Sequence, residues 1–330
     1  MIDKYERNIN YLRVSVTDRC NLRCMYCMPK EGVSWLGHND ILRYEEILRI
    51  VRIAATKGIG KVRVTGGEPL VRKGVVDFLS ELSGIEGLHD ISLTTNGILL
   101  EKMAKPLYEA GIRRINVSLD SLVPERYHNI TRGGDLNRVL KGLEEAERVG
   151  FDPIKINVVI IKDFNEDEID RFVRLALEQS YQVRFIEYMP IGDNMEQDFQ
   201  HLPSDKIVQW INTKIPLEPL NTPPGSLDGP ARLYRVVGTE GIIGFIGAMS
   251  SHLCAACNRL RLTSDGRLRA CLMSDEPEID LKPSLRRGCS DSHLQMLIEK
   301  IISMKPEGNR SHLLHPRRKK CVRTMSSIGG

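Results

Sequence analysis

The 330-residue sequence lacks any uninterrupted apolar run close to the roughly 20 residues that a membrane-spanning helix requires. Its first seven residues carry mixed charge and no apolar block, so we expect no signal peptide. Little net charge is present, at +4, which argues against nucleic acid as a partner but allows a local site for a polyanionic small molecule. Repeats of the solenoid type are also missing. We therefore expect a cytoplasmic globular protein that does not span a membrane.

Cysteine is the residue type whose use is most informative. A reducing cytoplasm disfavours disulfides, so the eight cysteines are expected to be metal ligands or free thiols. Six of them fall into two groups of three. Cys289 and Cys321 stand apart from both groups and are expected to be free.

Short β-rich runs alternate with amphipathic helical runs through the first 190 residues. Strands are expected at 12–16, 61–64, 91–94, 114–119, 154–160 and 184–187, and helices at 44–57, 99–110, 136–149 and 166–179. Gly58, Gly111 and Gly150 follow three of these helices as stop signals. Six strand–helix units predict an α/β fold, a partial (β/α)6 TIM-like barrel whose site residues follow the strands.

Composition changes after this region. Prolines and glycines crowd residues 203–230, and β-like runs follow at 234–237, 241–246 and 259–271, the last with a turn at 264–266. We therefore expect two units: a core barrel over 1–200, and a C-terminal β-containing extension over 201–330 that closes the barrel.

Cys20, Cys24 and Cys27 come directly after the first expected strand. Three thiolates at this spacing suit three irons of a [4Fe–4S] cluster, which leaves the fourth iron without a protein ligand and marks a catalytic cluster. A zinc loop is the alternative; it needs a fourth ligand, and the nearest histidine in sequence is His38.

This CxxxCxxC spacing, with Tyr26 before the third cysteine, resembles the radical S-adenosylmethionine (SAM) superfamily. The resemblance implies that the open iron binds SAM and that one electron then cleaves it to a 5′-deoxyadenosyl radical. Further segments consistent with this superfamily lie at the ends of expected strands, at residues 65–69, 94–97, 118–121 and 189–190. Taken singly, each favours an ordinary turn or core role; their shared placement at one sheet edge favours a site.

Cys254, Cys257 and Cys271 form the second group. The expected hairpin places Cys271 opposite Arg259 or Leu260, beside the other two cysteines. A second four-iron cluster is expected there. His252 offers the alternative of a Cys₃His zinc site, although it lies only two residues from Cys254.

Basic residues occur at or near several expected strands. Arg259 and Arg261 share one face of a strand, because side chains alternate along it. Such a pair is usually a solvated face. Together with Arg13, Arg63, Lys155 and Arg184, it would instead supply six cations to one cavity, which suits a triphosphate.

The order of these motifs resembles the GTP 3′,8-cyclase family of molybdenum cofactor biosynthesis over nearly the whole chain, in residues 13–20, 63–70, 115–120, 257–263 and 325–330. The resemblance implies two [4Fe–4S] clusters, the first on Cys20, Cys24 and Cys27 and the second, on the substrate side, on Cys254, Cys257 and Cys271. It implies SAM contacts from Tyr26, Gly67, Ser118 and Met189. It implies GTP contacts from Arg13, Arg63, Thr94, Lys155, Arg184, Arg259, Leu260 and Arg261, and a tail, Gly329 and Gly330, that reaches the active site.

The implied reaction converts GTP to (8S)-3′,8-cyclo-7,8-dihydroguanosine 5′-triphosphate, through abstraction of the ribose 3′ hydrogen and attack of that carbon on guanine C8. Cyclic pyranopterin monophosphate synthase would act next. An unidentified donor would supply electrons, and a homodimer is left open. Asn309, where the family pattern leads us to expect histidine, and the basic run 316–320 depart from the pattern and bear on tail docking; the basic run is expected to be solvated.

Two rival hypotheses remain. One is another radical SAM enzyme, of the peptide-maturing type with an auxiliary cluster. The other is a zinc-stabilised protein that binds RNA or phosphates through its basic hairpin.

Overall fold

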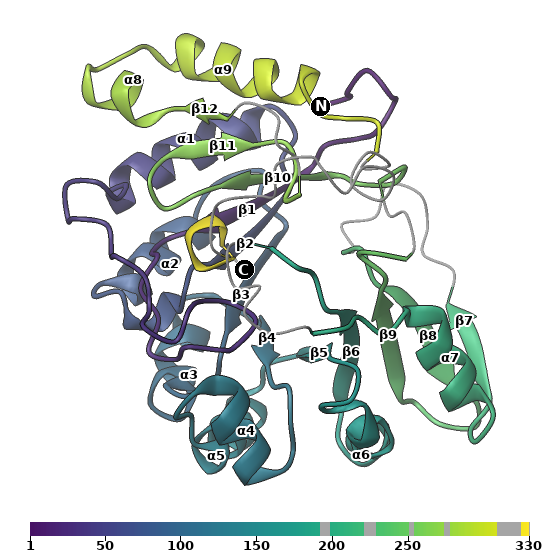
Figure 1. Ribbon diagram of the computed structural model, residues 1–330. Helices are drawn as coiled ribbons and strands as arrows, with labels where there is room; N and C mark the ends of the chain where they lie inside the picture. The colour runs from purple at the N-terminus through teal and green to yellow at the C-terminus, as the bar shows by residue number, and fades with distance from the viewer. Residues whose placement is uncertain (192–198, 221–228, 251–253, 274–277, 309–324, 330) are drawn as a thin grey trace.

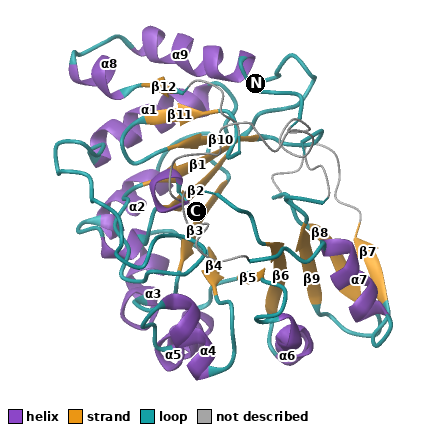
Figure 2. Cartoon of the chain, in the orientation of Figure 1, coloured by secondary structure: helices purple, strands orange, loops and turns teal. Residues whose placement is uncertain are grey.

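The computed structural model describes residues 1–330 apart from 192–198, 221–228, 251–253, 274–277, 309–324 and 330 (Figure 1). A 12-stranded sheet runs through the described residues in the order β12-β11-β10-β1-β2-β3-β4-β5-β6-β9-β8-β7. The sheet curves around the centre of the molecule, and helices cover its outer side (Figure 2).

Six parallel strands form the middle of this sheet, as the sequence predicted. They are β1 (Tyr11–Ser15), β2 (Lys61–Thr65), β3 (Asp90–Thr95), β4 (Arg114–Ser118), β5 (Ile154–Ile160) and β6 (Tyr181–Glu187). The connecting helices are α1 (Tyr44–Thr56), η1 (Pro69–Val71), α2 (Val75–Ser83), α3 (Leu100–Glu109), α4 (Pro124–Thr131), α5 (Leu136–Val149), η2 (Glu166–Glu168) and α6 (Ile169–Glu178). The four expected helices are present, and α2 and α4 are additional. Gly150 ends α5 with a φ of 98°, which explains a glycine at this stop.

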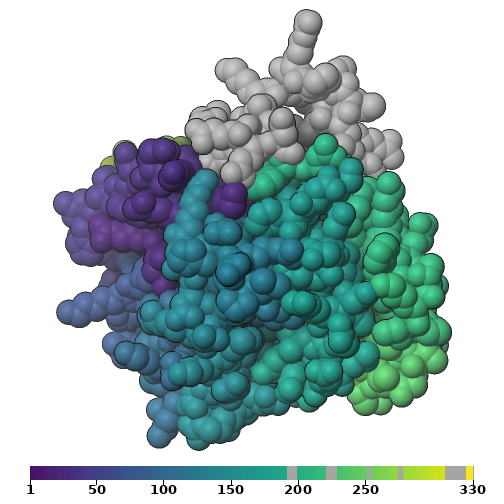
Figure 3. Space-filling view, turned by 60° about the horizontal axis from the view of Figure 1, so that its bottom comes forward, coloured from purple at the N-terminus to yellow at the C-terminus, as the bar shows by residue number. Residues whose placement is uncertain are grey.

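The C-terminal extension contributes to both edges of the core sheet. It comprises α7 (Ser204–Asn212), β7 (Leu217–Leu220), β8 (Arg232–Val236), β9 (Ile242–Ile246), β10 (Arg259–Leu262), β11 (Arg267–Arg269), β12 (Ile279–Asp280), α8 (Lys282–Arg286), α9 (Asp291–Ser303) and α11 (Met325–Ile328). Strand β9 pairs parallel with β6, and β10 pairs parallel with β1. The core and the β7–β9 part of the extension form one continuous surface (Figure 3).

The expectation that the extension closes the barrel is wrong. Strands β12 and β7 stand at opposite ends of the sheet and do not pair with each other. Each edge of the six-stranded core presents unpaired N–H and C=O groups, which a strand of the extension satisfies separately. The extension therefore widens the partial barrel and leaves it open.

The two faces of the sheet differ in chemistry. On β1, Leu12 and Val14 are buried in the apolar core, whereas Arg13 between them points to the opposite face, because side chains alternate along a strand. Arg13 lies level with Arg261 on β10 and Arg63 on β2. Closed barrels usually fill their interior with branched apolar side chains. Here arginines such as Arg13, Arg63 and Arg261 face the interior among apolar side chains, so the interior can receive a charged ligand.

Candidate active site

A cavity of about 330 Å³ lies inside the curved sheet. Both cysteine groups line it, although 227 positions separate Cys27 from Cys254. The other predicted site residues that line it are Arg13, Tyr26, Arg63, Gly67, Thr94, Ser118, Arg184, Met189, Arg259 and Arg261. The structure thus brings together residues from the core strands and from the extension.

The first cysteine loop follows β1. It turns tightly, with the N–H groups of Cys27 and Met28 both donating to Cys24 O, at 2.9 and 3.2 Å. Burial raises the pKa of Cys20 to about 11 and that of Cys27 to about 12. These thiols therefore stay protonated at neutral pH unless a metal supplies positive charge.

The donor chemistry of both groups fits iron–sulfur clusters. The seven cysteines that the structure describes are all free. Nowhere in the described part of the chain do three His, Cys, Asp or Glu side chains gather around a single ion position. Three thiolates in each group match the three irons of a cubane that protein cysteines would hold. His252, the alternative zinc ligand, lies outside the described residues.

Tyr26 connects the first cysteine loop to the end of β4. Its hydroxyl donates to Asp120 Oδ2 at 2.7 Å, and Val159 N–H donates to Asp120 Oδ1 at 2.8 Å. Burial raises the pKa of Asp120 to about 6, although these two hydrogen bonds oppose the rise. Sequence reasoning did not select Asp120 as a site residue, yet it lines the cavity, two residues beyond Ser118.

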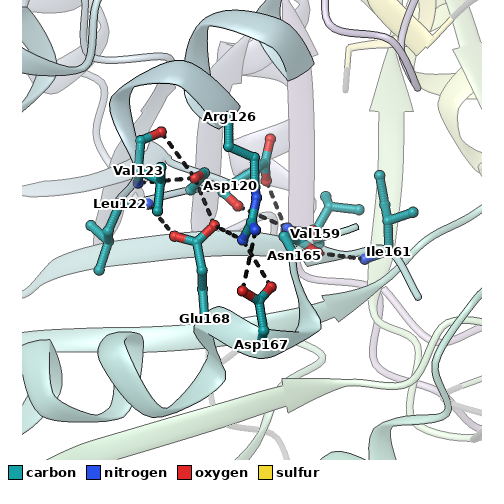
Figure 4. A network of polar contacts seen from close by, with 10 residues as sticks. Asp120, Leu122, Val123, Arg126, Val159, Ile161, Asn165, Asp167 and Glu168 are labelled. Carbon is teal, nitrogen blue, oxygen red and sulfur yellow. Dashed lines mark hydrogen bonds and ion pairs between the residues drawn. The ribbon is translucent and has the colours of Figure 1, made fainter. Parts of the chain in front are cut away.

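Asn165 and Glu168 hold this region in place (Figure 4). Asn165 Nδ2 donates to Asp120 O at 2.7 Å and to Val159 O at 2.9 Å, which joins the ends of β4 and β5. The buried carboxylate of Glu168 accepts from Leu122 N–H at 2.7 Å and Arg126 Nη1 at 2.6 Å. Asp120 therefore sits on a rigid support.

Gly67 lies where the loop after β2 crosses the first cysteine loop. A Cβ added at Gly67 would lie 2.7 Å from Asp18 O, so only glycine fits. The next residue, Glu68, is buried and accepts from Thr95 Oγ1 at 2.8 Å and Asn96 N–H at 2.7 Å. Burial raises the pKa of Glu68 to about 7. These contacts hold the ends of β2 and β3 against the cysteine loop.

The second cysteine group lies where the β10–β11 hairpin meets the loop before it. Arg261 pairs with Arg269, and extension of this register past the end of β11 would place Cys271 opposite Arg259, one of the two positions that the sequence predicted. Burial alone raises the pKa of Cys257, but the charges of Arg259 and Lys305 outweigh it and lower that pKa to about 6. Positive charge therefore dominates the surroundings of Cys257, whereas burial dominates those of Cys20 and Cys27.

Three residues that sequence reasoning missed support the second group. Lys305, 2% exposed, donates from Nζ to Arg259 O at 2.8 Å and Ala270 O at 2.7 Å. Arg7 Nη1 donates to Cys254 O at 2.9 Å and is paired with buried Asp3. No local pattern marks these roles, because every partner except Asp3 is distant in sequence.

Glu187, at the end of β6, is the third. Its carboxylate accepts from the N–H groups of Ser204 at 2.6 Å, Met249 at 2.7 Å and Ser250 at 2.9 Å. It thereby ties the loop that precedes the second cysteine group to the strand that precedes Met189.

Arginines form a row across the floor of the cavity, with Arg261, Arg13 and Arg63 on adjacent strands at one level. None of these three pairs with a carboxylate among the residues that the structure describes. Burial and the neighbouring Arg261 and Arg63 hold the pKa of Arg13 well below its usual range. Burial, then Arg184 and Arg63, lower the pKa of Lys155 to about 6. A polyanion would relieve this repulsion.

The remaining predicted residues lie around this row. Thr94 Oγ1 is buried and has no hydrogen-bond partner among the described residues, which leaves it available to a ligand. The side chain of Leu260 is buried in the apolar core, and Leu260 does not line the cavity. Lys155 lies on β5 and does not line the cavity.

The C-terminal helix α11 lies over the ends of β1 and β2 (Figure 1). The carbonyl oxygen of Gly329 accepts from Arg13 Nε at 2.8 Å and from Arg261 Nη1 at 3.3 Å. Gly330, Asn309 and the basic run 316–320 lie outside the described residues. The described part of the tail therefore reaches the arginine row.

Comparison with known proteins supports this arrangement. Residues 14–176 match the radical SAM superfamily, and residues 181–311 match the Molybdenum Cofactor Synthesis C family. Among solved structures, Streptococcus suis SuiB bound to S-adenosylmethionine shares the fold, with a TM-score of 0.62, 16% identity, and coverage of 98% of this chain and 77% of that chain. Native anSMEcpe with bound AdoMet also shares the fold, with a TM-score of 0.57, 17% identity, and coverage of 90% of this chain and 81% of that chain. No helix in the described residues is long and apolar enough to cross a membrane.

Sequence relatives extend over the full length. The GTP 3′,8-cyclase of Thermodesulfovibrio yellowstonii is 48% identical over 332 residues, and that of Pelotomaculum thermopropionicum is 50% identical over 332 residues. Each alignment covers 100% of both chains. The GTP 3′,8-cyclase of Moorella thermoacetica is 49% identical, again over the whole of both chains. The chain therefore belongs to the GTP 3′,8-cyclase family of the radical SAM superfamily.

Proposed function

We propose that this chain converts GTP to (8S)-3′,8-cyclo-7,8-dihydroguanosine 5′-triphosphate, the first step of molybdenum cofactor biosynthesis. The observation that carries the proposal is one cavity lined by two separate cysteine groups and a row of arginines. Full-length relatives that carry the name GTP 3′,8-cyclase support the same activity.

The cofactors are two [4Fe–4S] clusters and SAM. We assign the first cluster to Cys20, Cys24 and Cys27, and the second to Cys254, Cys257 and Cys271. When bound, the first cluster and SAM supply one-electron cleavage of SAM and thereby abstraction of a hydrogen atom from the substrate. Tyr26, Gly67, Ser118 and Met189 are assigned to SAM, since all four line the cavity.

The chain's own cations bind and orient the triphosphate. Arg13, Arg63 and Arg261 stand side by side without carboxylate partners in the described residues, so phosphate oxygens can take charge-assisted hydrogen bonds from all three. Arg259 extends the row toward the second cysteine group, where its charge helps to lower the pKa of Cys257. The complete proposed GTP set is Arg13, Arg63, Thr94, Lys155, Arg184, Arg259, Leu260 and Arg261, with Gly329 and Gly330 at its edge.

We propose a division into a core over residues 1–200 and an extension over 201–330. The two family matches, over 14–176 and 181–311, support two units, although the second match begins before this boundary and includes β6. Hydrogen bonding of β9 and β10 to the core means that the two units share one sheet. In a reducing cytoplasm an external donor would supply electrons, and cyclic pyranopterin monophosphate synthase would consume the product.

The test is anaerobic incubation with reductant, SAM and each nucleoside triphosphate separately, followed by mass spectrometry. We expect 5′-deoxyadenosine and a cyclised nucleotide with GTP, from protein that holds about eight irons per chain. A colourless protein that carries zinc would overturn the proposal. A cyclised product from another triphosphate in place of GTP would overturn the substrate.

A further inference from the structure

Asn96 lies between the first cysteine loop and the buried carboxylate of Glu68. Its backbone N–H donates to Glu68 Oε2 at 2.7 Å, and its side-chain Oδ1 accepts from Ile98 N–H at 3.1 Å. These contacts hold it in an Asx turn after β3. Because Ile98 needs an acceptor, the oxygen and nitrogen of the amide are assigned without ambiguity.

The other end of this amide faces the cysteine loop. Nδ2 donates to Asn21 Oδ1 at 2.8 Å and lies 3.8 Å from Cys20 Sγ, within the range of an N–H···S hydrogen bond. Its two hydrogens serve both acceptors. The backbone N–H of Leu22 approaches the same sulfur at 3.4 Å. Cys20 therefore receives a side-chain donor from Asn96 in addition to backbone donors from Asn21 and Leu22.

We propose that Asn96 is a positioning residue that raises the reduction potential of the cluster on Cys20, Cys24 and Cys27. One-electron reduction makes the cluster more negative, and an N–H dipole aimed at a ligand sulfur stabilises the more negative state. The inference rests on the proposed cluster assignment. It requires no change of protonation, because an amide does not titrate.

The role matters because this cluster must accept an electron before SAM is cleaved. Without the Asn96 donor, the potential falls and an external donor reduces the cluster less completely. The contact is also selective for the first cluster, since Asn96 follows β3 and contacts the first loop.

The test compares Asn96→Ser with the unaltered protein after anaerobic reconstitution. A serine hydroxyl can still accept from Ile98 N–H but is too short to reach Cys20. Iron content and an EPR-monitored redox titration are measured in the full chain, and again in a Cys257→Ser background that isolates the first cluster. We expect full iron occupancy of the first group, and a reduction equilibrium less favourable by about three- to tenfold, tenfold being 59 mV for one electron.

Two further variants sharpen the result. Asn96→Asp keeps the acceptor for Ile98, removes the donor and adds a negative charge, so the potential should fall further. Asn137→Ser, the same substitution as the first at an exposed position on α5, should leave it unchanged. If Asn96→Ser does not bind iron at the first cysteine group, the reduction potential of the Asn96→Asp cluster, measured in the same way, tests the proposal instead.

The possible failures are distinguishable. A full cluster whose potential is unchanged in the Asn96 variants overturns the role of Asn96 and leaves the proposed function standing. Absence of iron from the first cysteine group of the unaltered protein overturns the proposed function itself.

Discussion

Arg13 donates through Nε to the carbonyl oxygen of Gly329 at 2.8 Å, although 316 positions separate the two residues. Arg261 donates to the same oxygen at 3.3 Å. The last described residue of the chain therefore contacts the arginine row that we assign to the triphosphate. Composition alone would have left this glycine-rich end as a frayed terminus.

Serine variants of the two cysteine groups should lose different parts of the reaction. Cys24→Ser should abolish SAM cleavage, because the first cluster loses one of three ligands. Cys257→Ser should retain SAM cleavage but lose the cyclised nucleotide. Quantification of 5′-deoxyadenosine and nucleotide products separates the two effects, with Cys289→Ser, outside both groups, as the control. Unchanged 5′-deoxyadenosine from Cys24→Ser would contradict the first assignment, and unchanged nucleotide product from Cys257→Ser the second.

Arg259 should contribute directly to GTP affinity. Arg259→Ala removes a charge-assisted contact worth about 1.5–3 kcal/mol, so the GTP dissociation constant should rise by about 10- to 150-fold. Arg235→Ala is the control, because Arg235 lies on the extension and pairs with exposed Glu240. Equilibrium binding under anaerobic conditions measures both. If Arg259→Ala and the unaltered protein had equal dissociation constants for GTP, Arg259 would not contribute to GTP binding.

GTP binding should be coupled to proton uptake at Lys155. Its pKa is lowered to about 6 by burial and neighbouring cations, so it is mostly neutral at pH 7.5. Lys155 does not line the cavity, but Arg184, whose charge acts on Lys155, does. A polyanion bound at Arg184 offsets that charge and raises the pKa of Lys155, so up to one proton is taken up per GTP above pH 6. Calorimetry in buffers of different ionisation enthalpy measures the uptake. Lys155→Met should abolish it, and the same proton count in that variant would assign the uptake to another group.

Lys305 should stabilise the extension and its cluster. Lys305→Met removes the donor to part-buried Arg259 O and to buried Ala270 O, at a cost of up to about 1–3 kcal/mol each. We expect a lower free energy of unfolding in denaturant and less iron at the second cysteine group. Lys300→Met, on the exposed side of α9, is the matched control. If both variants were equally stable and equally loaded with iron, Lys305 would have no supporting role.

Local patterns were sufficient to predict much of the core. Short β-rich runs marked the six core strands, and observed boundaries such as Ile154–Ile160 agree closely with those expected. Helices α2 and α4 were not predicted. Helix α4 has few apolar positions, so its pattern is weak, and α2 is only 9 residues long. Periodicity is informative only where a segment is long enough to repeat it.

The sequence by itself determined the alternating strands and helices, the two cysteine groups, and a hairpin that brings Cys271 opposite Arg259 or Leu260, because each depends on neighbours along the chain. The tertiary structure alone decided that the barrel stays open and that Arg13, Arg63 and Arg261 stand level. It also decided that Asn96 and Lys305 reach their distant partners. Those features arise from pairing and packing between segments far apart in sequence, and side-chain periodicity carries no information about which strand edges will meet.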